Sequence, residues 1–188
     1  MDVAIGIEPV NGVKISRLVI HRLSGDIVFA PMFRRRAPLL TFSAHSRAGC
    51  GRFGAHPAPH VGCSCGFYAV ASDTELDRLG PLEKDAVIVD VDLGGRVVEH
   101  ELGVRAEVQA VRRVRVPNRC GRCDASGVEG FMLRHDTVSF KALTPVCAKC
   151  MAHCTLWHRR RCVPLTWAAV VALMSVTLEL WNPVSGVL

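Results

Sequence analysis

Four of the chain's nine cysteines form two Cys-x-x-Cys pairs, Cys120 with Cys123 and Cys147 with Cys150, separated by 23 residues. Each pair can present two thiolates from one tight turn, and four thiolates at about 2.3 Å satisfy tetrahedral Zn²⁺. The intervening segment FMLRHDTVSFKAL has the length and pattern of a β-hairpin. The spacing therefore predicts a closed zinc site with a structural role, because four protein ligands leave no position for a reacting water.

This layout resembles a zinc ribbon over residues 117–155. The resemblance implies a small structural module of a kind that often binds nucleic acid or protein. Gly121 in the first pair, CGRC, suits a tight turn, whereas the second pair, CAKC, has no glycine.

Two other chemistries remain open for these cysteines. A redox-active pair would stand at the start of a helix that follows a strand, whereas each pair here flanks a hairpin-length insert. An iron–sulfur cluster is the second alternative, because Cys154 and Cys162 extend the downstream pair to further thiols.

A second group of metal-binding residue types lies upstream in CGRFGAHPAPHVGCSCGFYA. We predict a second zinc site from Cys50, His56, Cys63 and Cys65, with His60 in reserve, since thiolates and imidazoles are the ligands that zinc prefers. The alternative is a loop of free thiols that bind no metal.

The pattern C-x5-H-x-A-P-x3-C-x-C-G-F-Y-A, with the later segment GGRVVEHELGVRAEVQAVRRV, resembles a group of small cysteine-rich proteins of actinobacteria and their phages. The similarity covers residues 44–116. It implies a cysteine loop joined to a small β-domain and assigns no reaction or substrate.

Charge is strongly segregated along the chain, whose net charge is +6. Residues 61–111 carry a net charge of −6, and residues 112–162 carry +8. This asymmetry suggests an anionic partner such as nucleic acid, or else an acidic face paired internally with basic flanks. The candidate phosphate-binding residues cluster around the Cys pairs: Arg112, Arg113, Arg115, Arg119, Arg122, Lys149, Arg159, Arg160 and Arg161.

No catalytic motif accompanies these candidate sites. The sequence contains no phosphate-binding loop of the Walker type, nucleophile elbow, His-Glu-x-x-His or dinucleotide fingerprint. The start of the chain has no secretory signal, and nine cysteines cannot all pair within one chain. We therefore expect a cytoplasmic, non-catalytic protein whose cysteines bind metal.

Several local patterns indicate secondary structure. Residues 13–29 should form two strands around Ser24-Gly25, and Ser72 with Glu75 should cap a short helix. The alternating valines of residues 87–97 predict a β-hairpin that turns at Gly94-Gly95. Residues 165–181, apolar nearly all round, predict one helix that is either buried or, as the less favoured alternative, a membrane anchor.

Together these features predict an α+β fold in three parts. The parts are a β-rich domain over residues 1–116 with its Cys/His loop at 44–66, a basic zinc ribbon-like module over 117–162, and a C-terminal apolar helix in 163–188. The expected function is non-catalytic binding, with a basic face on nucleic acid or a nucleoprotein complex. The alternatives are a protein–protein adaptor that regulates a host or cellular complex, and an iron–sulfur redox sensor.

Overall fold

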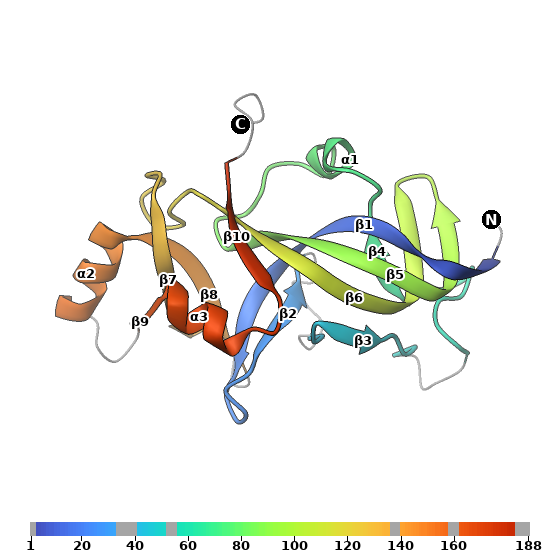
Figure 1. Ribbon diagram of the computed structural model, residues 1–188, viewed down its shortest axis with the longest axis horizontal. Helices are drawn as coiled ribbons and strands as arrows, with labels where there is room; N and C mark the ends of the chain where they lie inside the picture. The colour runs from blue at the N-terminus through green and yellow to red at the C-terminus, as the bar shows by residue number, and fades with distance from the viewer. Residues whose placement is uncertain (1–2, 33–40, 52–55, 136–139, 158–161, 183–188) are drawn as a thin grey trace. The chain divides into compact units, whose positions relative to one another are not determined.

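The computed structural model describes residues 3–32, 41–51, 56–135, 140–157 and 162–182 (Figure 1). These residues form ten strands and three short helices, and they divide into two compact units that are interleaved along the chain. Unit 1 comprises Met1–Lys14, Ala44–Gly80 and Val89–Arg113, and unit 2 comprises Ile15–Ser43, Pro81–Ile88 and Val114–Leu188. The predicted α+β class agrees with this β-rich fold, although nothing in the sheet is specific to a zinc ribbon.

The hydrogen-bonded strand order is β10-β6-β5-β1-β8-β7-β9, with β2 paired to β1 and with β3 and β4 paired to β6. Strands β1, β5 and β6 are long enough to contribute residues to both units. The elements are β1 (Val3–His21), β2 (Ile27–Pro31), β3 (His45–Arg47), β4 (Phe67–Ala69), α1 (Asp73–Asp77), β5 (Ala86–His100), β6 (Gly103–Pro117), β7 (Val128–His135), β8 (Phe140–Cys147), α2 (Ala148–Trp157), β9 (Cys162–Thr166), α3 (Trp167–Leu173) and β10 (Thr177–Trp181).

In unit 1 the short strands β3 and β4 both pair antiparallel with β6, and the Cys/His loop lies between them in sequence. Gly12 of β1 lies so close to β4 that a Cβ at this position would be 2.8 Å from Cβ of Ala69. The pairing of β3 and β4 to one strand brings the two ends of the Cys/His loop to the same strand.

In unit 2 the β7–β8 hairpin leads directly into α2, as Figure 1 shows. The predicted hairpin between the two Cys pairs is confirmed, with a register that runs from Val128 opposite Cys147 to His135 opposite Lys141. Three cysteines of the two Cys-x-x-Cys pairs, Cys120, Cys147 and Cys150, pack with Met132 and Val146 in one buried cluster. These three side chains are therefore part of the core of unit 2, whereas Cys123 is exposed.

Two local predictions are confirmed. β1 and β2 form the hairpin expected around Ser24-Gly25. The hydroxyl of Ser72 accepts a hydrogen bond from the Glu75 backbone N–H at the start of α1, as an N-cap should.

The predicted turn at Gly94-Gly95 is wrong, because β5 continues through both glycines and the chain reverses between His100 and Gly103. Gly95 has φ = +72°, and a Cβ there would lie 3.0 Å from the Glu107 carboxylate on β6. Glu107 also accepts hydrogen bonds from the Arg96 backbone N–H and from Arg47. Gly95 thus adopts a left-handed backbone conformation inside a strand, as in a β-bulge, and does not form a turn.

The predicted single helix over residues 165–181 is also wrong. This segment contains the end of β9, the seven-residue α3 capped by Thr166, and β10. β9 pairs with β7, and Trp181 of β10 accepts a hydrogen bond from the Asn118 backbone N–H. An apolar pattern alone does not distinguish a helix from short strands. Here the pairing of β9 with β7 and of β10 with β6 decides between the two. Among the helices of the described residues, none has the length and apolar character to span a membrane.

The glycine pair of β5 provides a matched test of this strand geometry. We expect Gly95→Ala to lower the free energy of unfolding by about 1–3 kcal/mol, because the new side chain would sit in a left-handed conformation against Glu107. We expect Gly94→Ala to be neutral or mildly stabilising, since no atom lies within 4 Å of its Cβ position. Urea unfolding of the two variants measures both effects; equal effects would contradict this account.

Candidate metal centres

The four cysteines of the two Cys-x-x-Cys pairs converge in unit 2, with all four sulfur atoms within 4.8 Å of one another. The Sγ atoms of Cys123 and Cys147 are 3.7 Å apart. Four thiolates at zinc–sulfur distances of 2.3 Å in a tetrahedron would have their sulfurs about 3.8 Å apart. The donor set and spacing therefore fit a tetrahedral metal ion.

The first pair lies on a tight turn directly after β6. The Cys120 backbone N–H donates to Ala125 O, and the Gly121 N–H donates to Pro145 O of β8. A Cβ at position 121 would be 2.6 Å from Cγ2 of Thr144 and closer still to the Lys84 backbone oxygen. A glycine is thus required at position 121, as predicted. The reason is that neighbouring segments approach its backbone closely, not the tight turn that the sequence suggested.

The second pair lies at a strand–helix junction rather than on a second tight turn. Cys147 is the last residue of β8, and Cys150 is in the first turn of α2. Redox-active pairs use the same junction. The convergence of all four sulfurs distinguishes this site from an isolated redox pair.

The pKa values of these thiols diverge strongly. Burial raises the pKa of Cys120, but hydrogen bonds from the backbone of Cys147, Cys123 and Arg122 outweigh it and lower the pKa to about 6. Burial and hydrogen bonds with the other three thiols raise the pKa of Cys150 to about 12. The protein alone stabilises the thiolate of Cys120 and disfavours that of Cys150, whereas a bound divalent cation would hold all four thiols deprotonated.

The second predicted ligand set also converges, in unit 1. The ligand atoms of Cys50, His56, Cys63 and Cys65 lie within 4.8 Å of one another, and all four side chains are half-buried. Cys50 Sγ is 3.4 Å from His56 Nε2 and 3.9 Å from Cys63 Sγ. A backbone hydrogen bond from Cys65 lowers the pKa of Cys63 to about 7, whereas burial and the neighbouring Cys63 raise that of Cys65.

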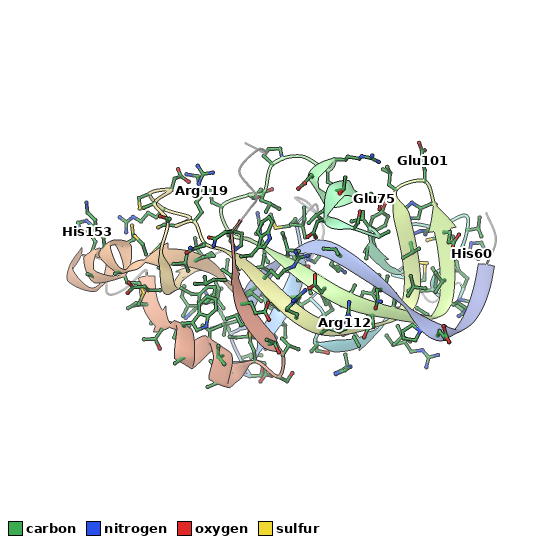
Figure 2. All side chains as sticks on the ribbon, turned by 45° about the horizontal axis from the view of Figure 1, so that its top comes forward. His60, Glu75, Glu101, Arg112, Arg119 and His153 are labelled. Atoms are coloured by element: carbon green, nitrogen blue, oxygen red, sulfur yellow. The ribbon has the colours of Figure 1, made fainter. Side chains whose placement is uncertain are left out.

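His56 and His60 differ in their surroundings. His56 Nδ1 lies 3.2 Å from Pro57 O, so a proton on Nδ1 would leave Nε2 as the metal ligand. His60 stacks on His56 with ring centroids 4.5 Å apart, and its Nδ1 accepts a hydrogen bond from the Gly62 N–H. His60 is exposed and lies outside the set of four (Figure 2).

Arg105 of β6 organises the Cys/His loop, a role the sequence analysis missed. Its Nη1 donates to the backbone oxygens of His60, Cys63 and Cys65. One guanidinium thus ties three points of the loop to the adjacent strand. No spacing rule marks this residue, because it lies 40 or more positions from the three residues whose backbone oxygens accept its hydrogen bonds.

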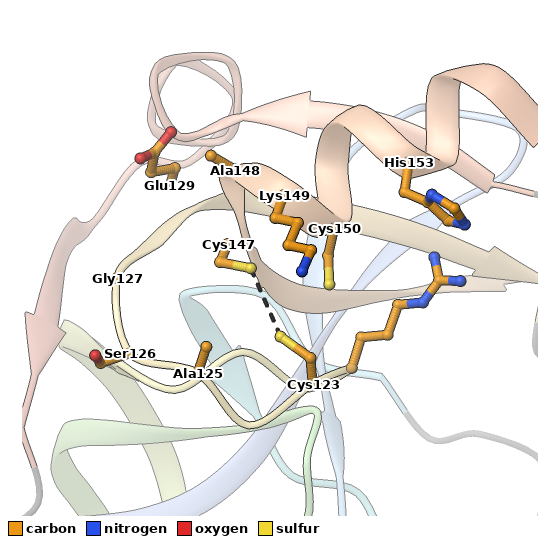
Figure 3. Close-up of a pocket in the computed structure, with 11 residues that line it drawn as sticks. Cys123, Ala125, Ser126, Gly127, Glu129, Cys147, Ala148, Lys149, Cys150 and His153 are labelled. Carbon is orange, nitrogen blue, oxygen red and sulfur yellow. Dashed lines mark hydrogen bonds between the residues drawn. The ribbon is translucent and has the colours of Figure 1, made fainter.

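The four-cysteine cluster borders a hollow of about 690 Å³ in unit 2 (Figure 3). Three of the four sulfur ligands line it, together with basic side chains and the small residues of the 125–127 turn. The lining basic residues are Arg122, Lys149 and His153, and the one acidic residue is Glu129. Figure 3 shows the Lys149 side chain extending toward the thiols of Cys123 and Cys150.

Four of the five predicted phosphate-binding arginines that the structure describes are ion-paired or buried. Arg112 pairs with Asp92 at 2.9 Å and Arg113 with Asp90 at 2.6 Å. Arg119 lies 3.4 Å from Asp124, and Arg115 is only 8% exposed. In the part of the chain that the structure describes, neither Arg122 nor Lys149 forms an ion pair. Arg159, Arg160 and Arg161 lie outside the described residues, as do the side chains of Cys154 and Cys162.

Comparisons with family models, curated proteins and solved structures return no match for this chain. The chemistry of the two clusters therefore carries the functional argument.

Replacement of Arg105 tests its role in the unit 1 cluster. We expect Arg105→Met to weaken metal binding there by about 10–100-fold, as loss of an outer-shell partner does, while binding at the four-cysteine cluster is unchanged. Competition with a chromogenic chelator measures both affinities. Arg112→Met, on the same strand, is the control and should change neither; an equal loss in both variants would refute the assigned role.

Proposed function

We propose that this chain is a non-catalytic, zinc-stabilised binding protein that uses the hollow beside its four-cysteine cluster to contact nucleic-acid phosphates. The observation that carries the zinc assignment is the convergence of two groups of four sulfur and nitrogen donors, one from two separate Cys-x-x-Cys pairs and one within a single loop. Four protein ligands complete a tetrahedral site and leave no open position for catalysis.

Zinc accounts for both donor sets better than iron does. Thiolates and imidazole suit Zn²⁺, and a three-cysteine, one-histidine set is a common structural zinc site. In most proteins an iron–sulfur cluster is held by cysteine thiolates. Iron would therefore explain the four-cysteine group but not the group that includes His56.

Metal analysis tests this assignment. We expect about two zinc ions per chain after anaerobic purification without added metal, and no visible absorption. Cys63→Ser and Cys120→Ser should each lower the zinc content by one, because each removes a ligand from a different cluster. Because structural zinc contributes folding energy, chelation should also lower the melting temperature. Iron with visible colour would contradict the proposal.

The nucleic-acid contact is proposed for the hollow because its basic side chains are available. Arg122 and Lys149 are exposed and without a carboxylate partner among the described residues, and His153 adds a third nitrogen donor. Among the described residues that line the hollow there is no Phe, Tyr or Trp, so stacking of bases on such rings is not expected there. The contact should therefore be to phosphate and independent of sequence.

The affinity should be modest. A zinc ion with four thiolates would keep a formal charge of −2, which the two positive charges of Arg122 and Lys149 only just offset. Two or three phosphate contacts then place the dissociation constant in the range of non-specific binding, about 10⁻⁴–10⁻⁶ M.

Binding to a single-stranded oligonucleotide of mixed sequence tests this contact. We expect the double variant Arg122→Gln/Lys149→Gln to bind about tenfold more weakly and to reduce the slope of log K against log salt by up to 2. The matched control is Lys84→Gln/Arg112→Gln, which removes the same charge from ion-paired positions. An equal loss of affinity in both double variants would mean that binding depends on overall charge, and it would refute the hollow as the binding site.

A protein–protein adaptor is the second candidate, favoured by apolar side chains exposed on β9, α3 and β10 of unit 2. These are Val163, Val171, Leu173 and Leu180. Binding through such a surface would be insensitive to salt, which separates the two functions.

A further inference from the structure

Cys123 differs from the other three members of its cluster in accessibility. It is exposed, whereas Cys120, Cys147 and Cys150 are 0%, 8% and 7% exposed. Oxidants react with thiolates that solvent can reach, so accessibility selects the sulfur that reacts first. Cys123 faces the hollow, which gives a small molecule a path to its sulfur (Figure 3).

A partner sulfur lies next to Cys123. The dashed line in Figure 3 joins Cys123 Sγ to Cys147 Sγ at 3.7 Å, and a disulfide requires about 2.05 Å. The missing distance is small, and Cys123 belongs to an exposed turn, whereas Cys147 is held in β8 by pairing with Val128. Movement of the turn alone can close the gap.

The charges around the hollow favour this reaction. Arg122 precedes Cys123, and Lys149 lies between Cys147 and Cys150. Both cations stabilise the hydroxide that leaves when a thiolate attacks peroxide.

We propose that Cys123 is an oxidation site at which hydrogen peroxide converts the zinc-binding cluster into a Cys123–Cys147 disulfide. The Cys123 thiolate attacks one peroxide oxygen, the O–O bond breaks, and hydroxide leaves to give a sulfenic acid. The Cys147 thiolate then attacks the Cys123 sulfur and displaces a second hydroxide. Two thiolates lose two electrons in total, peroxide accepts them, and two protons from water or buffer convert the hydroxides to water.

The consequence for the metal follows from the donor count. Disulfide formation removes two of four thiolates, and the remaining Cys120 and Cys150 do not hold a tetrahedral ion, so zinc is released. This step depends on the proposed zinc occupancy. The same oxidation would disturb the hollow, because Arg122 and Lys149 lie beside the two cysteines that react.

The experiment treats the full zinc-loaded chain with hydrogen peroxide, follows zinc with a chromogenic chelator, and maps disulfides by mass spectrometry after alkylation. We expect release of about one zinc per chain together with a Cys123–Cys147 disulfide, reversed by a thiol reductant and added zinc. Arg122→Gln/Lys149→Gln should slow the reaction several-fold, and Lys84→Gln/Arg112→Gln should not. In Cys63→Ser, which retains the four-cysteine cluster, the disulfide should still form.

A disulfide that forms first among Cys50, Cys63 and Cys65, or a Cys123 that stays reduced, would overturn the proposal. The metal content measured before oxidation distinguishes failure of the oxidation proposal from failure of the proposed function. If no zinc is bound, the proposed function fails, and the disulfide map still decides whether Cys123 and Cys147 react.

Discussion

The mutual repulsion of closely packed thiolates is the constraint on which both cysteine clusters depend. Four sulfurs within 4.8 Å cannot all ionise without a cation. Burial is the main cause that raises the pKa of Cys150, whereas backbone hydrogen bonds lower that of Cys120. Backbone N–H groups stabilise one thiolate, but they do not neutralise four. A divalent cation removes the conflict, so metal binding and folding of this part of the chain become one equilibrium.

The segregated charges of the sequence are partly neutralised by ion pairs within the sheet. Asp90 and Asp92 of β5 meet Arg113 and Arg112 of β6, so acidic and basic stretches that are adjacent in sequence become ion-paired neighbours. Asp90 is only 4% exposed, and removal of its partner would leave a buried charge. Net charge by segment therefore overstates the surface that is available to an anionic partner.

The convergence of the two groups of candidate metal ligands could be predicted because the determinants are local. Cys-x-x-Cys spacing and a loop of sixteen residues from Cys50 to Cys65 restrict where the donors can go, whatever the rest of the chain does. The failures concern long-range pairing. Gly94-Gly95 has turn composition, yet its role is set by Glu107 on the neighbouring strand, and residues 165–181 have a helical pattern that strand partners divide. Arg105 has no local signal at all, because its partners are backbone oxygens far away in the sequence.

The four-cysteine cluster combines two properties that usually occur apart in metal sites. Three of its sulfurs are buried in the core with Met132 and Val146, which suits a structural site, while the fourth is exposed at a basic hollow. The walls of that hollow come from the same turn and helix that carry the ligands. A metal bound by the four sulfurs would hold these elements together, so the proposed phosphate-binding surface would exist only while the cluster is intact. The exposure of Cys123 at that surface would then make the proposed binding sensitive to the chemical state of one sulfur atom.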